Sequence, residues 1–322
     1  AATGLRGIRY YLETPSKSIT FLEINKKVYG SLKKNVASNK IKAKTLNKSI
    51  QEFTNNTREK FDIIDLDPFG GITPYIYDLM KVSKGGTHLL ITATDMAVLC
   101  GADYKACLKL YDARPLHNEL CKEVGLRILI GYVARIAAQF NFGVEVLLSF
   151  SYMHYMRVFL KLNHGSDRSV ESIKGLGYAY YCNNCSYRHL KASIFPTMTE
   201  CPNCGKGLEI GGKLWAGSLQ DKKVIEPMLF DMSEEFPRKA YRKESVGFLR
   251  SILGEIDVPL YYSIPSLTKK MKIGSVSDIK TMELLESKGF EASKTHLEKA
   301  SLRTNATLKE IKQSIKTVSK GY

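Results

Sequence analysis

Residues 65–70 read DLDPFG and place two carboxylates, a proline and an aromatic ring at the end of the apolar run 61–66. In α/β sheets, ligands bind beyond the carboxyl ends of strands. A carboxylate and a backbone carbonyl there can accept both hydrogens of an exocyclic amine, orient the nitrogen lone pair and stabilise the positive charge that develops on nitrogen. We predict that Asp67 and the Pro68 carbonyl hold such an amine, for example N2 of guanine, and that Phe69 stacks on the extruded base.

The DLDPFG segment also has a simpler interpretation, because Asp-Pro pairs commonly form the turn that closes a strand. Pro68 restricts Asp67 to an extended conformation, which keeps the two acceptors out of a following helix. Both interpretations stay open at this point, and the position of Asp67 relative to a cofactor pocket decides between them.

A second candidate site is formed by the segment Thr3–Gly7 and by Glu23. TGLRG is typical of a glycine turn that leads into a helix, where Gly4 permits close backbone approach to a cofactor. Glu23 lies near the end of the next apolar run and suits the ribose hydroxyls of an adenosine cofactor. It follows Gly4 by 19 residues, near the spacing of about 20 found in dinucleotide-binding folds. The alternative for Glu23 is a solvated acid at a strand end.

Four of the seven cysteines form two Cys-x2-Cys pairs, Cys182 with Cys185 and Cys201 with Cys204, separated by 15 residues. This spacing is typical of two knuckles that supply four thiolates to a tetrahedral zinc ion. Asparagine, proline and glycine in and after the pairs favour the tight turns that knuckles require. Four thiolates leave no open coordination position, so we predict a structural zinc site, with four unligated thiols as the alternative.

The elements that must position these residues alternate between strand-like and helix-like segments in the first half. Apolar runs predict strands at 19–24, 61–66 and 87–93 and a hairpin at 144–152 and 155–162. Helical spacing or composition predicts helices at 25–39, 72–82, 102–111 and 116–140. Such alternation implies an α/β fold with a parallel sheet covered on both faces.

The second half begins after Gly165–Gly177, a polar, glycine-containing segment that we predict to be a linker. Beyond it lie the cysteine pairs and a Lys-rich stretch. Within that stretch, 264–273 and 276–288 predict short helices and 289–293 the start of a strand, the pattern of a small winged-helix-like unit.

Composition limits the classes of function. The net charge of +16 is spread over both halves of the chain, which fits a nucleic-acid partner or a Lys-rich solvated surface. The stretch Arg238–Lys243, with four cations around a tyrosine, has the same two interpretations. No run approaches the roughly 18 apolar residues of a spanning helix, so no membrane partner is expected. The odd cysteine count argues against a disulfide framework and for a reducing, cytoplasmic compartment.

Taken together, these residues resemble the tRNA guanine-26 N2-dimethyltransferase family, most closely its archaeal members. The resemblance rests on the segments 2–9 (ATGLRGIR), 65–70 and 92–95 (TATD). It is extended by 99–102 (LCGA) and 119–125 (ELCKEVG), runs with few gaps to about residue 165, and continues more loosely to the C-terminus.

The resemblance implies a Rossmann-like class I methyltransferase domain, residues 1–164, and a smaller α+β C-terminal domain, residues 175–322, that engages tRNA and carries the zinc-ribbon-like site of four cysteines. It implies an enzyme that transfers one or two methyl groups from S-adenosylmethionine to N2 of guanine-26 in tRNA. The matching catalytic positions are Asp67, Pro68 and Phe69, with Asp67 as the catalytic carboxylate and Phe69 in contact with the base. The matching cofactor-binding positions are Gly4, Arg6, Glu23, Ser49 and Ile50, with the ribose held by Glu23.

The chain departs from the family pattern at two places. Ser49-Ile50 stands where many members carry Asp-Ala near the adenine, so the resemblance implies a weaker adenine contact or one made through the hydroxyl. The family's first strand, and an upstream segment with a further arginine and an aromatic base contact, have no counterpart in this sequence. The chain is therefore expected to be N-terminally truncated, to bind cofactor poorly and to be inactive as it stands.

Two alternative functions are weighed against this one. Amino-methyltransferases that act on adenine or cytosine in rRNA or DNA use a related Asp/Asn-Pro-Pro-aromatic element with the aromatic in fourth place. Here the aromatic is third and Gly70 is fourth, which favours guanine, and no DNA substrate is expected. A non-catalytic zinc-ribbon RNA-binding protein explains the charge and the cysteines but leaves Asp67 and Glu23 without a purpose. The sequence does not indicate an oligomeric state.

Overall fold

The computed structural model describes residues 1–16, 18–234 and 242–320. Arg238–Tyr241, most of the basic stretch noted in the sequence, lie outside the described residues. Within the described part, no helix combines the length and the hydropathy that a bilayer-spanning segment needs.

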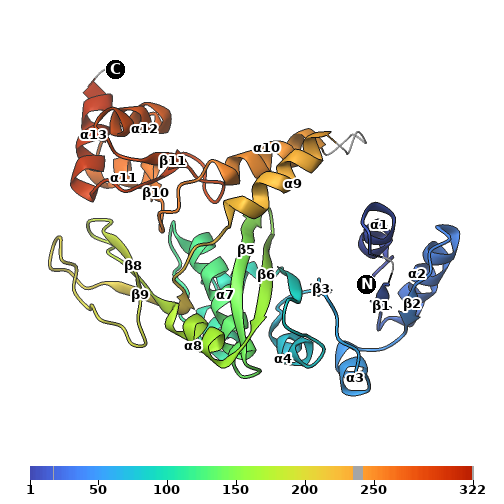
Figure 1. Ribbon diagram of the computed structural model, residues 1–322. Helices are drawn as coiled ribbons and strands as arrows, with labels where there is room; N and C mark the ends of the chain where they lie inside the picture. The colour runs from blue at the N-terminus through green and yellow to red at the C-terminus, as the bar shows by residue number, and fades with distance from the viewer. Residues whose placement is uncertain (17, 235–241, 321–322) are drawn as a thin grey trace.

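The elements form three groups along the chain (Figure 1). The first is α1 (Leu5–Glu13), β1 (Thr20–Leu22), α2 (Lys26–Ser38), β2 (Lys44–Leu46) and α3 (Ile50–Asn55). The second is β3 (Ile63–Leu66), α4 (Thr73–Lys81), β4 (His88–Ala93), α5 (Met96–Leu99), α6 (Tyr104–Tyr111), α7 (Cys121–Ala138), β5 (Phe142–Tyr152), β6 (Tyr155–His164) and α8 (Ser166–Lys174). The third is β7 (Leu176–Tyr181), β8 (Arg188–Ala192), β9 (Glu209–Trp215), α9 (Lys222–Glu234), α10 (Arg242–Leu253), β10 (Tyr262–Ser263), α11 (Ile264–Met271), α12 (Asp278–Ser287), β11 (Ala292–Lys294), β12 (Ser301–Thr304) and α13 (Leu308–Lys320).

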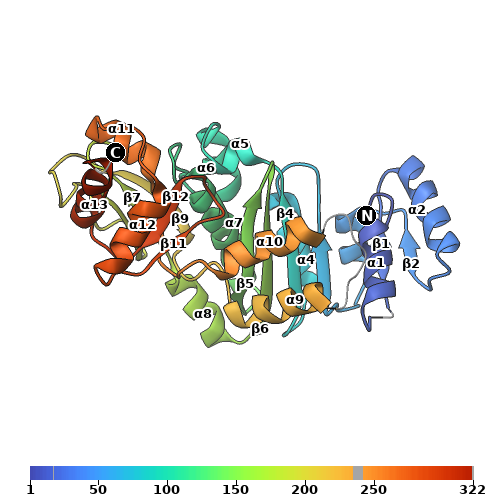
Figure 2. The ribbon, with the colours of Figure 1, turned by 90° about the horizontal axis from the view of Figure 1, so that it is seen from above.

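The N-terminal unit is a two-stranded parallel sheet of β1 and β2 with α1 and α2 packed against it. Its small core contains Phe21, Leu32 and Val36, and the last two have the helical spacing that predicted α2. The Asn25 side chain caps α2 by accepting from two backbone amides, as the sequence favours at this position. Figures 1 and 2 place this unit at one end of the molecule, opposite the C-terminal helices.

The central sheet has the strand order β3-β4-β6-β5. β3 and β4 are parallel, but β6 lies antiparallel to both β4 and β5. The prediction of a parallel sheet was therefore wrong for one strand of the four, β6, which runs opposite to β3, β4 and β5. The physical reason is the short turn between Tyr152 and Tyr155, because a hairpin can only join antiparallel neighbours.

Both faces of the central sheet are covered, as predicted. The helix α7 packs on one face, and α9 and α10 pack on the other through Ile225, Leu249 and Ile252. A register shift between Val146 and Leu148 marks a bulge in β5. Because an extra residue reverses the alternation, Val146 faces the α7 side whereas Leu148 faces the α9 side.

The segment predicted to be a linker, Gly165–Gly177, is instead the helix α8 followed by the start of β7. Its hydropathy pattern conceals the helix, because Ser169 and Ser172 are buried whereas Val170 and Ile173 are exposed. The Ser172 hydroxyl accepts a hydrogen bond from the amide of Val144 at 2.8 Å, so a polar residue provides the packing face against β5. The segment therefore lacks the apolar stripe by which a packed helix is recognised in a sequence.

The second sheet, with order β8-β7-β9, packs against α7. Leu176, Ala179 and Leu214 of this sheet belong to the same apolar cluster as Val133 of α7. The largest core thus extends across the boundary predicted between residues 164 and 175, and the division into two domains stays a prediction.

The C-terminal unit carries α11, α12 and α13 around a three-stranded antiparallel sheet with order β10-β12-β11. The predicted helices at 264–273 and 276–288 are present as α11 and α12, and the strand expected near 289–293 is β11. One strand before the helix pair and a hairpin after it agree with the winged-helix-like interpretation.

A buried charge cluster joins the C-terminal unit to the central sheet. Glu123 of α7 is fully buried and forms ion pairs with Arg127 at 2.9 Å and with Arg303 of β12 at 3.0 Å. It also accepts the amide of Leu260 at 3.0 Å. Arg303 pairs in addition with Glu255 at 2.7 Å. The cluster therefore fixes β12 against the helix that covers the central sheet.

Candidate active site

The DLDPFG segment lies at the carboxyl end of β3, and Thr94-Asp95 follows the parallel neighbour β4. Because both strands run the same way, their ends meet at one edge of the sheet. The amide of Gly70 donates to the Thr94 hydroxyl at 2.8 Å, and the amide of Thr94 donates to the Gly70 carbonyl at 3.2 Å. These bonds join the two loops into one platform.

Arg6 connects this platform to the N-terminal glycine turn. Its guanidinium donates to Asp65 at 2.8 Å and to Asp67 at 2.6 Å. Tyr10, one helical turn further along α1, donates its hydroxyl to Asp65 at 2.6 Å. Asp67 is thus in an ion pair, but its partner belongs to the helix that begins at the predicted cofactor turn.

The two acids of the segment have different surroundings. Asp65 is 14% exposed and also pairs with Arg157 of β6 at 3.1 Å, so two cations and a phenol surround it. Asp67 is 43% exposed, and Phe69 is fully exposed next to it. Burial and the hydrogen bond to Asp65 raise the pKa of Tyr10, which keeps this phenol a neutral donor. Asp65 is therefore a structural anchor, while Asp67 and Phe69 are accessible to a substrate.

The residues at the glycine turn fit an adenosine cofactor. Gly4 has φ 83° and precedes α1, and a Cβ at this position would lie 2.4 Å from Leu32. Only glycine adopts this conformation without strain. Glu23, at the end of β1, accepts the amides of Ala2 at 2.7 Å and Asn25 at 2.8 Å. The structure therefore brings the acid and the turn together, as a site for a ribose and its attached groups requires.

Ser49 and Ile50 lie at the start of α3. The Ser49 hydroxyl caps this helix by accepting the amide of Glu52 at 3.0 Å. Asn47 holds the preceding loop to the end of β1 by donating to the carbonyls of Glu23 at 2.7 Å and Ile24 at 3.0 Å. The oxygen of Ser49 is therefore engaged in capping the helix. Its hydroxyl hydrogen is the group that can donate a hydrogen bond to an adenine.

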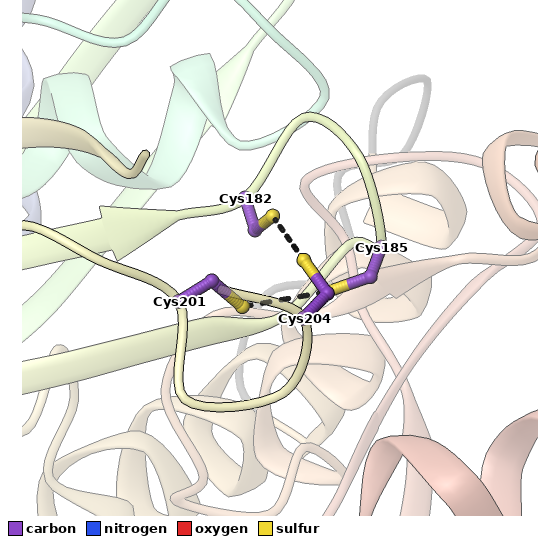
Figure 3. A group of neighbouring side chains, drawn as sticks. All are labelled: Cys182, Cys185, Cys201 and Cys204. Carbon is purple, nitrogen blue, oxygen red and sulfur yellow. Dashed lines mark hydrogen bonds between the residues drawn. The ribbon is translucent and has the colours of Figure 1, made fainter. Parts of the chain in front are cut away.

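The four predicted metal ligands converge (Figure 3). Their sulfur atoms all lie within 4.8 Å of one another, and the pairs Cys182/Cys204 and Cys185/Cys201 are 3.5 Å apart. Zinc–sulfur bonds of about 2.3 Å in a tetrahedron place the sulfurs about 3.8 Å apart, so the cluster fits a Zn²⁺ ion.

Both knuckles have the same hydrogen-bond pattern. The carbonyl of Cys182 accepts the amide of Ser186 at 2.9 Å, and the carbonyl of Cys201 accepts the amide of Gly205 at 2.8 Å. The amides of both cysteines donate in turn to a carbonyl five residues ahead, in Tyr187 and Lys206. This repeated turn aims each Cys-x2-Cys pair at a common centre.

Comparison with known proteins agrees with this geometry. Residues 1–316 match the family model described as N2,N2-dimethylguanosine tRNA methyltransferase. The chain belongs to this family. The match favours the guanine family over an adenine or cytosine methyltransferase and over a non-catalytic zinc-ribbon protein.

The curated relatives that the chain matches include the tRNA (guanine(26)-N(2))-dimethyltransferases of Pyrococcus abyssi and Methanothermobacter thermautotrophicus. The protein of Pyrococcus abyssi is 37% identical over 322 residues, covering 95% of this chain and 82% of that protein. The protein of Methanothermobacter thermautotrophicus is 32% identical over 315 residues, covering 97% of this chain and 82% of that protein.

Among solved structures, Trm1 from Pyrococcus horikoshii in complex with S-adenosyl-L-methionine is similar with a TM-score of 0.90 and 32% identity. The match covers 98% of this chain and 86% of that chain. The predicted α/β fold with a Rossmann-like class I methyltransferase domain is thereby confirmed.

The structure also identifies contacts at the site that the sequence did not indicate. Asp65 and Tyr10 join the platform to α1, and Arg157 neutralises Asp65 from the antiparallel strand β6. The spacing of Arg6 and Tyr10, four residues apart on one helix face, was a signal in the sequence. No sequence signal connected Arg157 with Asp65, because the pair is formed by strands that meet only in the folded sheet.

Proposed function

We propose that this protein transfers one or two methyl groups from S-adenosylmethionine to N2 of guanine-26 in tRNA. The observation that carries the proposal is the half-exposed carboxylate of Asp67 beside the exposed Phe69, linked by Arg6 to the glycine turn next to Glu23. In this arrangement Gly4, Arg6, Glu23, Ser49 and Ile50 line the cofactor, and Asp67, Pro68 and Phe69 hold the base. The family and the names of the relatives supply the substrate.

The chemistry of the site follows from its charges. When bound, the cofactor supplies an electrophilic methyl group on a sulfonium. Asp67 and the Pro68 carbonyl accept the two hydrogens of the guanine amine, so the nitrogen lone pair is aimed at that methyl. To do so, Asp67 exchanges its bond from Arg6 for one from the amine, while Arg6 keeps its bond to Asp65.

Each transfer forms one N–C bond, breaks the C–S bond and releases one proton from N2. The Asp67 carboxylate is the acceptor for this proton. Because Asp67 is 43% exposed in the free protein, it can return the proton to water before a second methyl is transferred.

The basic charge of the protein supports tRNA as the partner. A net charge of +16 attracts a polyanion and favours contacts to phosphates, which are independent of sequence. The C-terminal unit, held against α7 by the buried charge cluster, is the proposed part that engages the tRNA body.

The purified full-length protein, incubated with tritiated S-adenosylmethionine and unmodified tRNA, is expected to label N2 of a guanine. Nucleoside analysis of the digested tRNA identifies the labelled atom. Label on N6 of adenine would replace the guanine assignment, and tight tRNA binding without any label would replace the enzyme by a binding protein.

We also propose that the cluster of four cysteines holds one structural Zn²⁺ ion. Cys182, Cys185 and Cys201 are buried in the same apolar cluster as Leu267 and Ile311 of the C-terminal unit. None of the seven cysteines, all of which lie in the described residues, forms a disulfide. The metal would therefore stabilise the junction between the second sheet and α11 and α13.

The substitution Cys182→Ser is expected to lower bound zinc from about one ion per chain to well below that value, together with the melting temperature. Elemental analysis and thermal unfolding measure the two effects. The matched control is Cys100→Ser, because Cys100 lies outside the cluster and is expected to leave the zinc content unchanged. Unaltered zinc in Cys182→Ser would contradict the assignment.

A further inference from the structure

Next to the DPFG loop lies a partly buried hydrogen bond between Tyr111 and Asp95. The hydroxyl of Tyr111, the last residue of α6, donates to Oδ2 of Asp95 at 2.8 Å. Tyr111 is fully buried, and its ring packs edge-on against Tyr132 with centroids 5.4 Å apart. The position of the hydroxyl is therefore fixed by packing.

The side chain of Asp95 does not cap the helix α5 that follows it. Asp95 is the residue that precedes α5, where an aspartate normally accepts amides of the first helical turn. Its side chain makes no such bond here and is directed to Tyr111 instead. Oδ1 of Asp95 is buried and has no hydrogen-bond partner among the described residues. Burial also raises the pKa of Asp95, so the site holds a carboxyl group that solvation does not stabilise.

This pair is in direct contact with the loop that carries the proposed catalytic residues. A Cβ added to Gly71 would lie 2.7 Å from Oδ2 of Asp95 and 3.4 Å from the Tyr111 hydroxyl. The backbone amide of Ile72, a residue with no solvent exposure, also lies close enough to the Tyr111 hydroxyl to oppose the rise that burial causes in its pKa. The backbone at residues 71–72 is thus pressed against the two side chains, which leaves no space for the loop to retract.

Gly70, the residue before Gly71, is held by a second contact. Its amide donates to the Thr94 hydroxyl, and its carbonyl accepts the amide of Thr94. Thr94 directly precedes Asp95, so one short segment after β4 provides both supports. Asp67 itself has its ion pair only on the side of α1, with Arg6, among the described residues.

We propose that Asp95 and Tyr111 are positioning residues, which hold the DPFG loop so that Asp67 and the Pro68 carbonyl face the guanine amine. This role rests on the proposed methyl transfer. Asp95 acts as a hydrogen-bond acceptor and not as a proton acceptor for the substrate, because its oxygens are enclosed by Tyr111, Gly71 and the neighbouring Cys107.

The substitution Tyr111→Phe removes only the hydroxyl. It is expected to lower kcat about 10- to 100-fold, because small displacements of reacting groups have effects of this size. The KM for tRNA is expected to stay within about threefold, since phosphate contacts dominate affinity. Asp95→Ala is expected to have the same effect, and the double variant Tyr111→Phe/Asp95→Ala should be no slower than either single variant, because all three lose one shared hydrogen bond.

Two further variants separate positioning from other roles. Asp95→Asn keeps an oxygen that can accept from Tyr111, so it is expected to retain kcat within about threefold. Tyr132→Phe removes a hydroxyl group from the adjacent ring, and that hydroxyl donates to the Thr73 carbonyl. This variant is expected to leave kcat unchanged. The proposal is overturned if Tyr111→Phe keeps the wild-type kcat, if the single effects multiply in the double variant, or if Asp95→Asn is as slow as Asp95→Ala.

Hydrogen exchange provides a readout that does not depend on activity. Amides in residues 69–72 are expected to exchange faster in Tyr111→Phe than in the wild type and in Tyr132→Phe. A wild type that labels no guanine would disprove the proposed function while this measurement still tests the support of the loop. Unchanged exchange at 69–72 would overturn the positioning role by itself.

Discussion

Replacing Asp67 with alanine is expected to lower kcat for methyl transfer by at least about 10³-fold and to leave the dissociation constant for tRNA within a few-fold. The loss removes the acceptor that orients the amine and the negative charge that stabilises the developing cation, two contributions of the size seen for preorganised groups. Affinity is retained because tRNA binding is dominated by phosphate contacts. Single-turnover transfer and filter binding measure the two quantities.

The matched control for this experiment is Asp62→Ala. Asp62 lies just before β3, is 84% exposed and pairs with Lys84, so the variant removes a carboxylate from the same segment without touching the platform. It is expected to keep the wild-type kcat. A fall in tRNA affinity comparable to the fall in kcat would contradict the catalytic assignment of Asp67, since it would show that the residue contributes mainly to binding.

Much of the candidate site could be predicted from the sequence because local chemistry determines it. Proline after Asp67 enforces an extended turn at the end of a strand, and an apolar run predicts that strand. The Cys-x2-Cys spacing alone predicted the convergence of four sulfur atoms that the structure finds within 4.8 Å of one another. The Asp-Pro pair and each Cys-x2-Cys pair span four residues or fewer, and over so short a stretch backbone geometry leaves few alternatives.

The remainder depended on contacts between distant segments. The contact of Tyr111 with Asp95 next to the DPFG loop could not be predicted, because it depends on how α6 packs against the end of β4. The pair of Arg157 with Asp65 required the antiparallel order of β4 and β6, which the alternation of strands and helices did not indicate. The helix α8 was missed for another reason, since its buried face consists of serines and its hydropathy pattern is therefore inverted.

The ion pair between Arg6 and Asp67 gives the resting site a defined charge state. Burial by itself lowers the pKa of Arg6. The carboxylates of Asp65 and Asp67 raise it by more than burial lowers it, so the guanidinium stays charged. Arg6 thus holds the Asp67 side chain in one orientation before a substrate arrives. The shared arginine also explains how the glycine turn and the DPFG loop, 59 to 61 residues apart in sequence, are held as one site.

The substitution Glu123→Gln is expected to destabilise the protein by about 3–5 kcal/mol. It removes the negative charge that compensates Arg127 and Arg303 in the interior, and an unpaired buried charge costs far more than the pair contributes. Glu123 has no solvent exposure, so screening does not reduce this effect. Urea unfolding at neutral pH measures the loss, and Glu145→Gln, which removes an exposed partner of Lys161, is expected to change stability by less than about 1 kcal/mol.

The same residue determines how the protein responds to acid. Burial alone raises the pKa of Glu123, but Arg303 and Arg127 outweigh it and hold the pKa at about 2, below the ordinary value of 4.5. A depressed carboxyl pKa contributes stability that is complete above about pH 4.5 and is lost as the pH falls toward 2. The wild type is therefore expected to lose stability across this interval, and Glu123→Gln should show a shallower slope there. Equal slopes would contradict the prediction, because they would mean that another carboxyl group controls the acid transition.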